Sequence, residues 1–499
     1  MSAERVVVIG AGMGGLAAAI DLAVAGLEVV VCEAQAYPGG KMRSVEVMGR
    51  PVDAGPTVFT LRAVFDSLFD HAGASFDEHV PTEAIGVLAR HAWDAETRFD
   101  LLAAPDAARD AVAEFAGAAE ARGFDRFRER AQTMFDTLDA TFLQAQRPSM
   151  VDFVRRIGLS RPGALFGLDP LSTLWTALRR DLKDPRLVQL FGRYATYCGS
   201  SPFAAPATLM LIAHVEQVGV WSVKAGMQAL PRAMADLAQA RGAQIRYGAP
   251  VRRIRVEDGR AAGVELADGE PITAGAVVSN ADAGAYAQGL LGESVRQAAG
   301  PVRPKDRSLS ALVWTANTPT SGFPLPRHTV FFSRDYRDEF VRLFDQDRLP
   351  QEPTVYVCAQ DRDDDARSPD GPERLLILTN APAVGDRDGL SQEEIAQCEA
   401  ATFDQLARCG LRVERSPERV RLTDPAQFHR LFPGTGGALY GRATHGPWAT
   451  FQRPGARSRL PGLYLAGGSI HPSAGAPMAT LSGRLAAKQL LQDRSSIKR

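Results

Sequence analysis

Four glycines near the start of the chain are spaced so that a backbone turn can hold a pyrophosphate. Gly10, Gly12 and Gly15 form a G-x-G-x-x-G pattern, and Gly14 lies between the last two. In this pattern the first glycine permits a tight turn, the second lets the backbone approach the phosphates, and the third lets a helix pack closely on a strand. The free N–H groups at the start of that helix bind anions. The spacing therefore predicts a site for a dinucleotide.

A carboxylate follows these glycines at the distance that suits a ribose. Apolar residues 6–9 predict a strand, residues 13–25 a helix, and residues 28–32 a second strand that ends at Glu33. An acid at this position accepts hydrogen bonds from the two ribose hydroxyls of an adenosine and repels a 2′-phosphate. The order of strand, glycines, helix, strand and acid predicts a Rossmann-type unit that binds an unphosphorylated adenosine.

A second glycine pair behind this acid indicates which dinucleotide binds. Gly39, Gly40 and Lys41 follow Glu33 within a few residues, and Pro56 lies in a Gly-Pro turn after them. Such a pair is unusual in NAD domains and resembles the FAD-binding pattern of the amine oxidase and carotenoid desaturase superfamily. That resemblance implies that Gly39, Gly40 and Lys41 line the pyrophosphate and that Pro56 approaches the flavin.

A strand ending in small residues, followed by a helix, forms a further candidate site near the end of the chain. Residues 462–466 predict the strand, Gly467 and Gly468 follow it, and Met478 and Ala479 belong to the first turn of a helix that opens after a proline. The N–H groups of that turn would stabilise the negative charge of a reduced flavin at its pyrimidine end. We therefore expect these residues at the flavin.

The middle of the chain separates these sites and predicts different elements. Residues 61–214 predict mostly helices, and residues 245–266 predict two strands joined by a turn at residues 257–259. In flavoproteins a segment of this kind rejoins the nucleotide domain, which places Val251 near the adenine. Residues 309–440 predict a mixture of strands and helices.

Residues 93–221 are rich in aromatic side chains, and two arrangements explain this enrichment. The rings either fill an ordinary hydrophobic core or line a tunnel for a long apolar ligand, since aromatic side chains give wide apolar contact at modest entropic cost. The sequence leaves both arrangements open. Residues 361–374, which are dense in charge and interrupted by prolines, are expected to form a solvated loop rather than a site.

The composition argues against several classes of function. The 499 residues include 57 Lys and Arg against 58 Asp and Glu, and a net charge of −1 argues against nucleic acid as a partner. The cysteines and histidines lack metal-ligand spacing, so no metal site is expected. The longest uncharged apolar stretch, residues 199–215, contains prolines and is too short for a spanning helix of ~20 apolar residues. The first residues lack the basic segment of a secretory signal.

Several longer stretches together resemble one enzyme family. They are GAGMGGLAAA at residues 10–19, DAGPTVFTLR at 53–62, LARHAW at 88–93, VYVCAQDR at 355–362 and GLYLAGGSIHPSAGAPM at 462–478. Along nearly its whole length the chain is similar to bacterial carotenoid desaturases of the phytoene desaturase type. Within that family it most resembles the 1-hydroxycarotenoid 3,4-desaturases of purple phototrophic bacteria, also called hydroxyneurosporene or methoxyneurosporene dehydrogenases. It departs from the family pattern at Ala225-Gly226, where relatives have a glycine pair.

The resemblance implies an α/β fold in which a Rossmann-type FAD-binding domain is interleaved with a mixed α+β substrate domain, as in amine oxidases. Residues 1–60, 215–295 and 441–499 are expected to form the FAD-binding domain. Residues 61–214 and 296–440 are expected to form the substrate-binding domain around a polyene tunnel.

The resemblance also implies FAD-dependent desaturation of a C40 carotenoid, most closely 3,4-desaturation of 1-hydroxycarotenoids in spheroidene- or spirilloxanthin-type biosynthesis of photosynthetic bacteria. In such a reaction a hydride leaves an allylic carbon and a proton leaves its neighbour, while conjugation spreads the developing positive charge. No dedicated base is then required, and the sequence identifies no catalytic residue. Phytoene desaturase, carotenoid isomerase and a non-catalytic carotenoid carrier stay open as alternatives. An amine oxidase is disfavoured because no aromatic pair is evident near the C-terminal glycines.

A membrane-dissolved substrate and the lack of a predicted spanning helix imply peripheral, monotopic association with the membrane surface on the cytoplasmic side. The candidate contacts are the apolar residues 203–212 and the basic residues Arg303, Lys305 and Arg307. No second G-x-G-x-x-G follows a strand. Electrons are therefore expected to leave the FAD for another acceptor, oxygen or a quinone, rather than for a nicotinamide.

Overall fold

A parallel five-stranded sheet holds the predicted nucleotide-binding unit in the computed structural model, which describes residues 5–160, 168–169, 171–364, 366–387 and 389–497. Its strand order is β10-β2-β1-β14-β22, and all neighbouring strands run parallel. The strands are Arg5–Ile9 (β1), Glu28–Cys32 (β2), Gln244–Arg246 (β10), Ala276–Ser279 (β14) and Leu463–Leu465 (β22). Distant stretches of the chain therefore meet in one sheet, and the predicted α/β fold with an interleaved Rossmann-type unit is confirmed.

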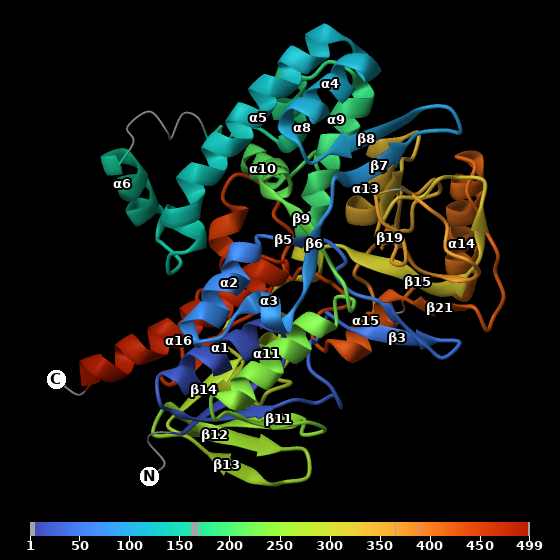
Figure 1. Ribbon diagram of the computed structural model, residues 1–499. Helices are drawn as coiled ribbons and strands as arrows, with labels where there is room; N and C mark the ends of the chain where they lie inside the picture. The colour runs from blue at the N-terminus through green and yellow to red at the C-terminus, as the bar shows by residue number, and fades with distance from the viewer. Residues whose placement is uncertain (1–4, 161–167, 170, 365, 388, 498–499) are drawn as a thin grey trace.

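Helices cover this sheet, and two of them approach each other closely. α1 (Met13–Val24), α11 (Ala229–Ala240) and α16 (Ala476–Ile497) lie together in the lower part of Figure 1. A Cβ atom on Gly483 of α16 would lie 2.0 Å from the carbonyl oxygen of Gly14 in α1. Only a glycine at position 483 therefore lets these two helices cross at this distance.

A separate antiparallel sheet contains the predicted hairpin. β11 (Val251–Glu257) pairs with β12 (Arg260–Leu266), and β13 (Pro271–Thr273) pairs with β12 on its other edge. Asp258 and Gly259 form the connecting turn with φ angles of 48° and 71°. A positive φ at both central residues matches the twist of a two-residue hairpin, so the turn lies where the sequence predicts it.

A seven-stranded sheet forms another side of the molecule, in the order β21-β15-β19-β18-β17-β7-β8. Its strands are Val87–Ala92 (β7), Arg98–Leu102 (β8), Ser310–Thr318 (β15), His328–Phe331 (β17), Val355–Ala359 (β18), Glu373–Ala381 (β19) and Val420–Thr423 (β21). The prediction of mostly helical structure is therefore wrong for residues 82–102. Burial alternates along β8 with the period of two that is typical of a strand, and the helical interpretation overlooked that period.

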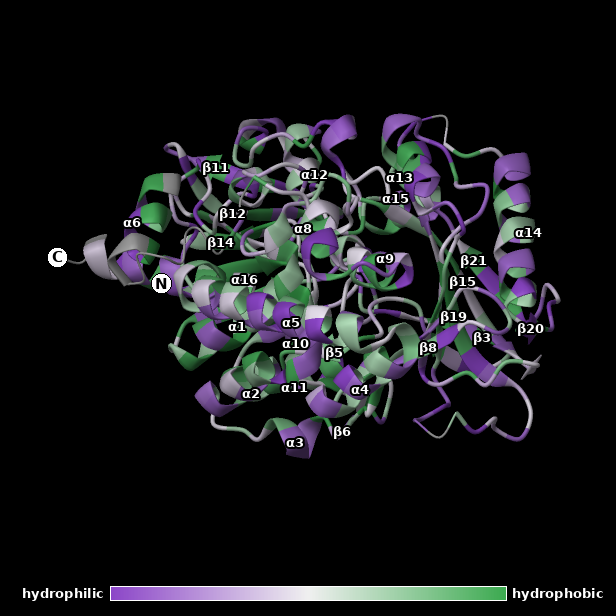
Figure 2. Ribbon diagram, turned by 90° about the horizontal axis from the view of Figure 1, so that it is seen from above, coloured by the Kyte–Doolittle hydropathy of each residue, from purple (hydrophilic) through white to green (hydrophobic). Residues whose placement is uncertain are grey.

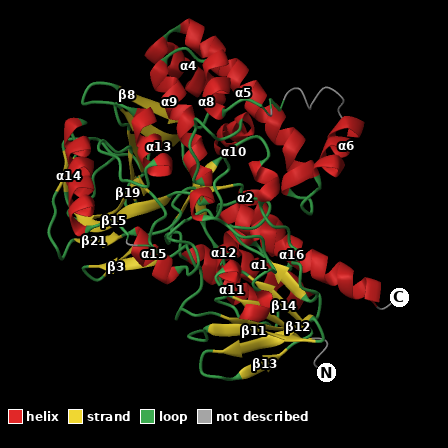
Figure 3. Cartoon of the chain, turned by 180° about the vertical axis from the view of Figure 1, so that it is seen from behind, coloured by secondary structure: helices red, strands yellow, loops and turns green. Residues whose placement is uncertain are grey.

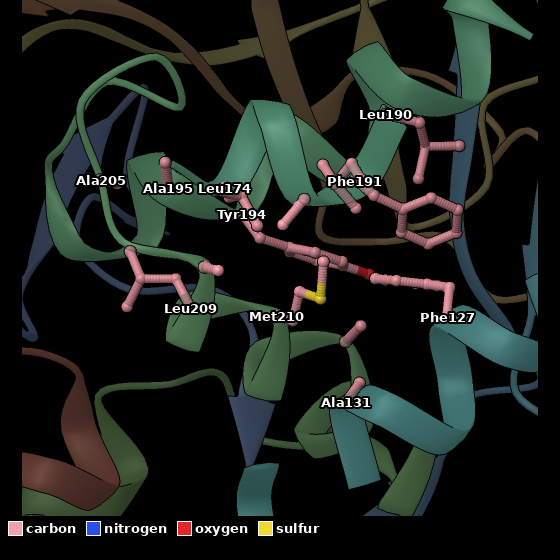
Figure 4. Packing of buried hydrophobic residues seen from close by; sticks show 14 of the residues in the cluster. Phe127, Ala131, Leu174, Leu190, Phe191, Tyr194, Ala195, Ala205, Leu209 and Met210 are labelled. Atoms are coloured by element: carbon pink, nitrogen blue, oxygen red, sulfur yellow. The ribbon is translucent and has the colours of Figure 1, made fainter. Parts of the chain in front are cut away.

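Helices gather above both sheets, at the top of Figure 1. They are α4 (Pro105–Ala116), α5 (Ala118–Leu138), α6 (Met150–Ser160), α8 (Leu174–Asp181), α9 (Pro185–Gly192), α10 (Leu211–Val218), and the 3-10 helices η3 (Arg193–Cys198) and η4 (Ala207–Met210). In Figure 4, Phe127 and Ala131 of α5 face Phe191, Tyr194 and Met210 across the core of this helical cluster. α5 continues into a π-helical turn, η2 (Asp139–Leu143), and such turns are frequent at functional sites.

Shorter elements connect these parts of the molecule. β9 (Val220–Val223) pairs with both β5 (Phe59–Thr60) and β6 (Thr82–Ala84). Figure 3 shows α14 (Gln392–Arg408) on the outer side of the seven-stranded sheet. The remaining elements are β3 (Ser44–Val47), β4 (Arg50–Asp53), α2 (Arg62–His71), α3 (Phe76–His79), α12 (Ala283–Ala287), η5 (Glu293–Val295), η6 (Pro304–Asp306), β16 (Thr320–Ser321), α13 (Tyr336–Asp345), α14 (Gln392–Arg408), β20 (Arg412–Val413), α15 (Pro425–Leu431) and η7 (Ala449–Gln452).

The charge-dense segment at residues 361–374 is not simply a solvated loop, contrary to the prediction. The side chains of Arg362 and Glu373 are only 1% and 2% exposed, and two N–H groups of the guanidinium donate to the carboxylate at 2.7 Å. Opposite charges pair here at the start of β19. The sequence shows the charges but does not show that they satisfy one another inside the protein.

The residues expected to contact a membrane do not form an exposed apolar surface. None of residues 203–212 is exposed, and the guanidinium of Arg307 is buried against Asp386. Arg303 pairs with Asp306. The prediction of a contact surface is therefore wrong for residues 203–212 and for Arg307, whereas Arg303 and Lys305 do lie on the surface. In the described part of the chain, no helix is both long enough and apolar enough to cross a membrane.

Candidate active site

A cavity of about 790 Å³ lies where the parallel sheet, the seven-stranded sheet and the helical cluster meet. One part of its wall is backbone from the glycine turn after β1. Another part consists mostly of apolar side chains from η2, η4, α10 and the loop at residues 447–451. The cavity is within the range of ligand sites, roughly 300–1,000 Å³, and its two parts differ in chemistry.

The N-termini of α1 and α16 both open onto this cavity. The predicted cofactor residues that line it at these two places are Gly10, Gly12, Gly14, Gly468, Met478 and Ala479. A Cβ atom on Gly14 would lie 2.8 Å from the backbone nitrogen of Gly467 and 2.9 Å from the carbonyl oxygen of Ala479. Glycine at position 14 thus leaves room for the two helix ends to converge. Free N–H groups and two positive dipole ends then face one cavity, which suits a pyrophosphate.

The carboxylate of Glu33 lies in the cavity wall and is held by the backbone. The backbone nitrogen of Ala11 donates to Oε2 at 2.6 Å, and that of Gln35 donates to Oε1 at 2.8 Å. Burial raises the pKa of Glu33, and these two hydrogen bonds oppose that shift. The carboxylate is therefore fixed at the tip of β2. Its contact with a ribose stays a prediction.

Four further predicted cofactor residues line the cavity: Gly39, Gly40, Lys41 and Pro56. The Nζ atom of Lys41 donates to the carbonyl oxygen of Leu439 at 2.7 Å and lies 5.6 Å from the centre of the Phe432 ring. Burial lowers the pKa of Lys41, and the negative charge of Asp282 opposes that shift. The ammonium thus faces residues 432–439, and its contact with the pyrophosphate stays a prediction.

Two residues predicted to bind the cofactor, Gly15 and Gly467, do not line the cavity but lie behind its wall. A Cβ atom on Gly15 would lie 2.0 Å from the carbonyl oxygen of Gly10, and one on Gly467 would lie 2.6 Å from Oδ1 of Asn280. Gly15 therefore has the packing role expected of the third glycine in the pattern. Val251 does line the cavity, and its contact with the adenine stays a prediction.

Asn280 is a cavity residue that the sequence reasoning missed. Its backbone nitrogen donates to the carbonyl oxygen of Ile9 at 2.9 Å, and its side chain lies against Gly10, Gly12 and Gly14. A signal was available, because Asn280 directly follows β14. In a parallel sheet, ligands bind at the carboxyl ends of the strands.

The turn after β9 needs only one glycine, although relatives have a pair there. Gly226 has a φ of 82°, whereas Ala225 does not have a positive φ. The backbone nitrogen of Met227 donates to Oδ2 of Asp53 at 2.8 Å, and this hydrogen bond fixes the turn. The departure from the family pattern therefore leaves the turn intact.

The aromatic residues of the segment 93–221 divide between the two roles that the sequence left open. Phe142, Phe153 and Tyr197 line the cavity, whereas most of the others that the structure describes fill the hydrophobic core. The remaining rings of the wall come from later in the chain, namely Tyr356, Phe428, Phe432, Tyr440, Trp448 and Phe451. The core explanation thus holds for most of the segment, and the cavity wall is assembled from distant residues.

A polar group interrupts the apolar part of the wall. Tyr194 and Tyr197 each donate to a carboxylate oxygen of Glu216 at 2.5 Å. Arg193 and Tyr197 line the cavity, and Nη2 of Arg193 lies 3.5 Å from the Tyr197 hydroxyl oxygen. Burial lowers the pKa of Arg193, but Tyr197 and Glu216 outweigh that effect, so the guanidinium stays charged. The sequence assigned none of these four residues to a site.

Another hydrogen-bonded chain connects strands β17 and β18 of the seven-stranded sheet to the Gly-Pro turn. The hydroxyl oxygen of Tyr356 lies 2.7 Å from Oγ1 of Thr57 and 2.8 Å from Nδ1 of His328. Burial lowers the pKa of His328 to about 3, so its imidazole is neutral at physiological pH. Because Thr57 follows Pro56 directly, this chain lies beside the predicted flavin position.

His471 joins the C-terminal loop to the π-helical turn. Its Nε2 atom lies 3.0 Å from the carbonyl oxygen of Phe142 and 2.9 Å from that of Ala145. Nε2 therefore carries the hydrogen and donates it, while burial lowers the pKa of His471 to about 4. A neutral imidazole thus holds together two elements that both line the cavity.

Fold and cavity together define an oxidoreductase with a dinucleotide cofactor. The residues present fit FAD, because two helix N-termini face the cavity for a pyrophosphate, Glu33 is fixed for a ribose, and apolar side chains surround the space beyond them. A family model described as flavin-containing amine oxidoreductase matches residues 13–491. The chain belongs to that family, and FAD is its cofactor.

Comparison with characterised proteins narrows the relationship. The chain is 52% identical to "Hydroxyneurosporene desaturase" of Rubrivivax gelatinosus over 99% of this chain and 95% of the relative. It is 44% identical to the protein of the same name from Rhodobacter capsulatus, over 99% of each chain. It is also 27% identical to "1-hydroxycarotenoid 3,4-desaturase" of a Flavobacterium species, over 97% of this chain and 98% of the relative. The predicted resemblance to carotenoid desaturases is confirmed.

Solved structures share the fold at low sequence identity. Putrescine oxidase bound to putrescine superposes with a TM-score of 0.61 and 16% identity, over 99% of each chain. Cyclohexylamine oxidase from Brevibacterium oxydans superposes with a TM-score of 0.59 and 17% identity, over 99% of this chain and all of the other. Sequences this different can share one fold, so these likenesses establish the architecture alone.

Proposed function

We propose that this protein desaturates a C40 carotenoid with bound FAD, and specifically that it introduces the 3,4 double bond of 1-hydroxycarotenoids. The observation that carries this proposal is full-length similarity, up to 52% identity, to hydroxyneurosporene desaturases. The cavity supports it, because a backbone-lined part suited to a dinucleotide continues into a part lined by apolar and aromatic side chains. A long polyene needs such an apolar wall.

The side chains of this cavity bind, orient and exclude water rather than attack the substrate. Bound FAD supplies the acceptor for a hydride. Glu33 and the N-termini of α1 and α16 would hold it, and the first turn of α16 presents N–H groups toward negative charge. Phe142, Phe153 and their apolar neighbours would keep the polyene aligned and dry, since alignment lowers the barrier of such a transfer.

The carboxylates of the cavity lie on its cofactor side. Among the described residues of the wall, the acidic ones are Glu33 and Asp282. The apolar part therefore offers no carboxylate beside the polyene. This distribution fits a reaction in which conjugation in the substrate spreads the positive charge, and we assign no catalytic base.

Product analysis tests the proposal. The FAD-loaded protein is incubated with 1-hydroxyneurosporene, with neurosporene and with phytoene, and the products are separated and identified by mass and absorption spectrum. We expect a product of 1-hydroxyneurosporene that has lost two hydrogens and gained one conjugated double bond at the hydroxylated end. Turnover of phytoene alone would assign a phytoene desaturase instead. A product of unchanged mass would assign an isomerase, and a protein that cannot bind FAD would be a carrier.

We also propose that the protein associates peripherally with a membrane, on the cytoplasmic side, and draws its substrate from it. Three exposed large apolar side chains support this: Val151 on α6 is 76% exposed, Leu171 is 81% exposed and Trp448 is 49% exposed. Phe153 of the same helix and Trp448 also line the cavity. Figure 2 shows α6 at the edge of the molecule, with hydrophobic positions along part of its ribbon.

Co-sedimentation with neutral phospholipid vesicles tests the membrane proposal. A Val151→Asp, Leu171→Asp variant is expected to stay in the supernatant, because two charges would enter the bilayer surface. Val218→Asp is the matched control, since Val218 is 54% exposed and does not line the cavity. Equal sedimentation of both variants and the unchanged protein would contradict the proposal.

The division of the chain into two domains also stays a proposal. Residues 1–60, 215–295 and 441–499 include all five strands of the parallel sheet, and residues 61–214 and 296–440 include all seven strands of the other large sheet. Phe65 and Phe69 of α2 pack in the same core as α1, so the two proposed domains share buried surface.

Oxygen or a quinone is the proposed electron acceptor, in a pathway of photosynthetic bacteria.

A further inference from the structure

A buried cation faces the apolar part of the cavity with most of its hydrogen-bond donors unused. Arg193 is 8% exposed and lines the cavity from the start of η3. Among the described residues, its guanidinium forms one hydrogen bond, to the Tyr197 hydroxyl oxygen at 3.5 Å, which is at the limit for such bonds. Its Nε atom has no hydrogen-bond partner among them. Its guanidinium carbon also lies 5.8 Å and 5.2 Å from the ring centres of Tyr194 and Tyr197. A guanidinium has five N–H donors and no acceptor, so this side chain can still donate to an oxygen in the cavity.

The positive charge of Arg193 is balanced by the carboxylate of Glu216, which does not line the cavity. The carboxylate of Glu216 is occupied by the hydroxyls of Tyr194 and Tyr197, each at 2.5 Å. Because the Tyr197 hydroxyl donates its hydrogen to Glu216, its oxygen can still accept hydrogen bonds. The cavity therefore meets a pair made of one strong donor, Arg193, and one acceptor, Tyr197.

This pair lies beside the elements that are expected to surround the flavin. Cys198, the next residue after Tyr197, has its Sγ atom 3.8 Å from Oγ of Ser473 in the loop before α16. The pKa of His328 is lowered mainly by burial, then by the positive charge of Arg327, and to a smaller extent by that of Arg193. His328 is hydrogen-bonded to Tyr356, which is hydrogen-bonded to Thr57. The 3-10 helix η3 that carries Arg193 and Tyr197 thus contacts the C-terminal loop through Cys198, and all of these residues line one cavity with Thr57 and Tyr356.

We propose that Arg193 and Tyr197 recognise the terminal hydroxyl of the polyene substrate. This inference rests on the proposed function, in which carbon 1 carries the hydroxyl and carbons 3 and 4 react. These atoms are separated by two or three bonds, so a hydroxyl-binding site must lie next to the reacting bond. Arg193 and Tyr197 are suited to that place because they line the same cavity as the residues expected at the flavin, and η3 contacts the loop before α16.

The hydrogen bonds of this arrangement are complementary. The hydroxyl oxygen accepts from the Arg193 guanidinium, and the hydroxyl hydrogen goes to the phenolic oxygen of Tyr197, which already donates to Glu216. A substrate without the hydroxyl would leave the buried guanidinium unpaired against hydrocarbon. Sites built for a hydroxyl reject such analogues strongly, and we expect a selectivity of about 10- to 100-fold from one charge-assisted hydrogen bond.

Two variants and one matched control test the proposal. Arg193→Met removes the donors at similar length, and Tyr197→Phe removes the acceptor while it keeps the ring. Tyr194→Phe is the control, because Tyr194 bonds the same carboxylate at the same 2.5 Å but does not line the cavity. Each FAD-loaded protein is tested with 1-hydroxyneurosporene and with neurosporene, both for kcat/KM and for carotenoid binding by the shift of the polyene spectrum. The flavin spectrum is recorded for each.

The expected result is a loss of preference. Arg193→Met should bind and convert 1-hydroxyneurosporene about 10- to 100-fold less well, and neurosporene as well as before or better, because no unpaired guanidinium then faces the hydrocarbon. Tyr197→Phe should lose part of the preference, and Tyr194→Phe should keep it. An equal loss for both carotenoids, or a changed flavin spectrum in Arg193→Met, would overturn the proposal, because Arg193 would then serve the fold or the cofactor. If the unchanged protein binds 1-hydroxyneurosporene preferentially but does not desaturate it, the proposed function fails and this inference stands.

Discussion

The cofactor part and the substrate part of the cavity are built in different ways. Around α1 and α16 the wall is backbone, and its shape depends on glycines such as Gly14, whose Cβ would lie 2.8 Å from a neighbouring nitrogen. Around η2, η3 and α10 the wall is side chains from segments far apart in the sequence. The first part tolerates almost no added atom, whereas the second can change its lining one side chain at a time. A family can therefore keep its cofactor and change its substrate.

The largest effect is expected at the cofactor part. Gly14→Val would place a branched side chain between Gly467 and Ala479, where even a Cβ has no space. We expect FAD affinity to fall by about 100-fold or more, since overpacking costs roughly 1–3 kcal/mol or more and also blocks the site. Flavin fluorescence on titration measures this loss. Gly300→Ala is the control, because a Cβ there meets nothing within 4 Å; equal affinities for the two variants would contradict the account.

A pair of phenylalanines separates stability from substrate binding in the helical cluster. Phe127 is fully buried in the core and does not line the cavity, whereas Phe153 does line it. Phe127→Ala is expected to lower the free energy of unfolding by about 3–5 kcal/mol, with little change in KM for the carotenoid.

Phe153→Ala is the matched variant for that prediction, and it should raise KM and destabilise the protein less. Denaturant unfolding and steady-state kinetics on both variants measure the two effects. If Phe127→Ala raised KM as much as Phe153→Ala does, the distinction between core and wall would be wrong.

The contact between the two parts should depend on pH through His471. Its pKa is lowered from 6.5 to about 4 in the folded protein, so the unfolded chain binds the proton more readily between these values. The free energy of unfolding must then fall as pH drops from 6.5 toward 4, by about 1.4 kcal/mol per pH unit and roughly 3 kcal/mol in all from this residue.

His471→Gln keeps a hydrogen-bond donor but does not titrate in this range. Urea unfolding at a series of pH values should therefore show a shallower slope for this variant than for the unchanged protein. Identical slopes would mean that His471 is not buried as a neutral donor between the C-terminal loop and the π-helical turn.

A smaller effect is expected at the ribose acid. Glu33→Gln removes the negative charge. The amide keeps one oxygen that can accept a hydrogen bond from the backbone N–H of Ala11 or of Gln35. We expect FAD affinity to fall about 10-fold, the value of one charge-assisted hydrogen bond. Glu28→Gln at the other end of β2 is the control, since Glu28 is half exposed and pairs with Arg5. Unchanged affinity in Glu33→Gln would remove Glu33 from the cofactor site.

The two parts also differ in how far the sequence predicts them. The glycine turn, Glu33 and the strands around them depend on residues close together in the chain, so local patterns suffice. Asn280 and Gly483 act through contacts between distant elements, and no local pattern marks the second of them. Arg193 and Glu216 in sequence look like ordinary charged residues. Their roles follow only from the packing of η3 on α10, which places both inside the helical cluster.

An anaerobic half-reaction tests the central claim most directly. The FAD-loaded protein is mixed with 1-hydroxyneurosporene in the absence of any acceptor, and flavin absorbance and carotenoid products are followed together. The account predicts that the flavin is bleached in proportion to a carotenoid that has lost two hydrogens and gained one conjugated double bond. An unbleached flavin with this substrate, alongside rapid bleaching by a primary amine such as putrescine, would contradict it.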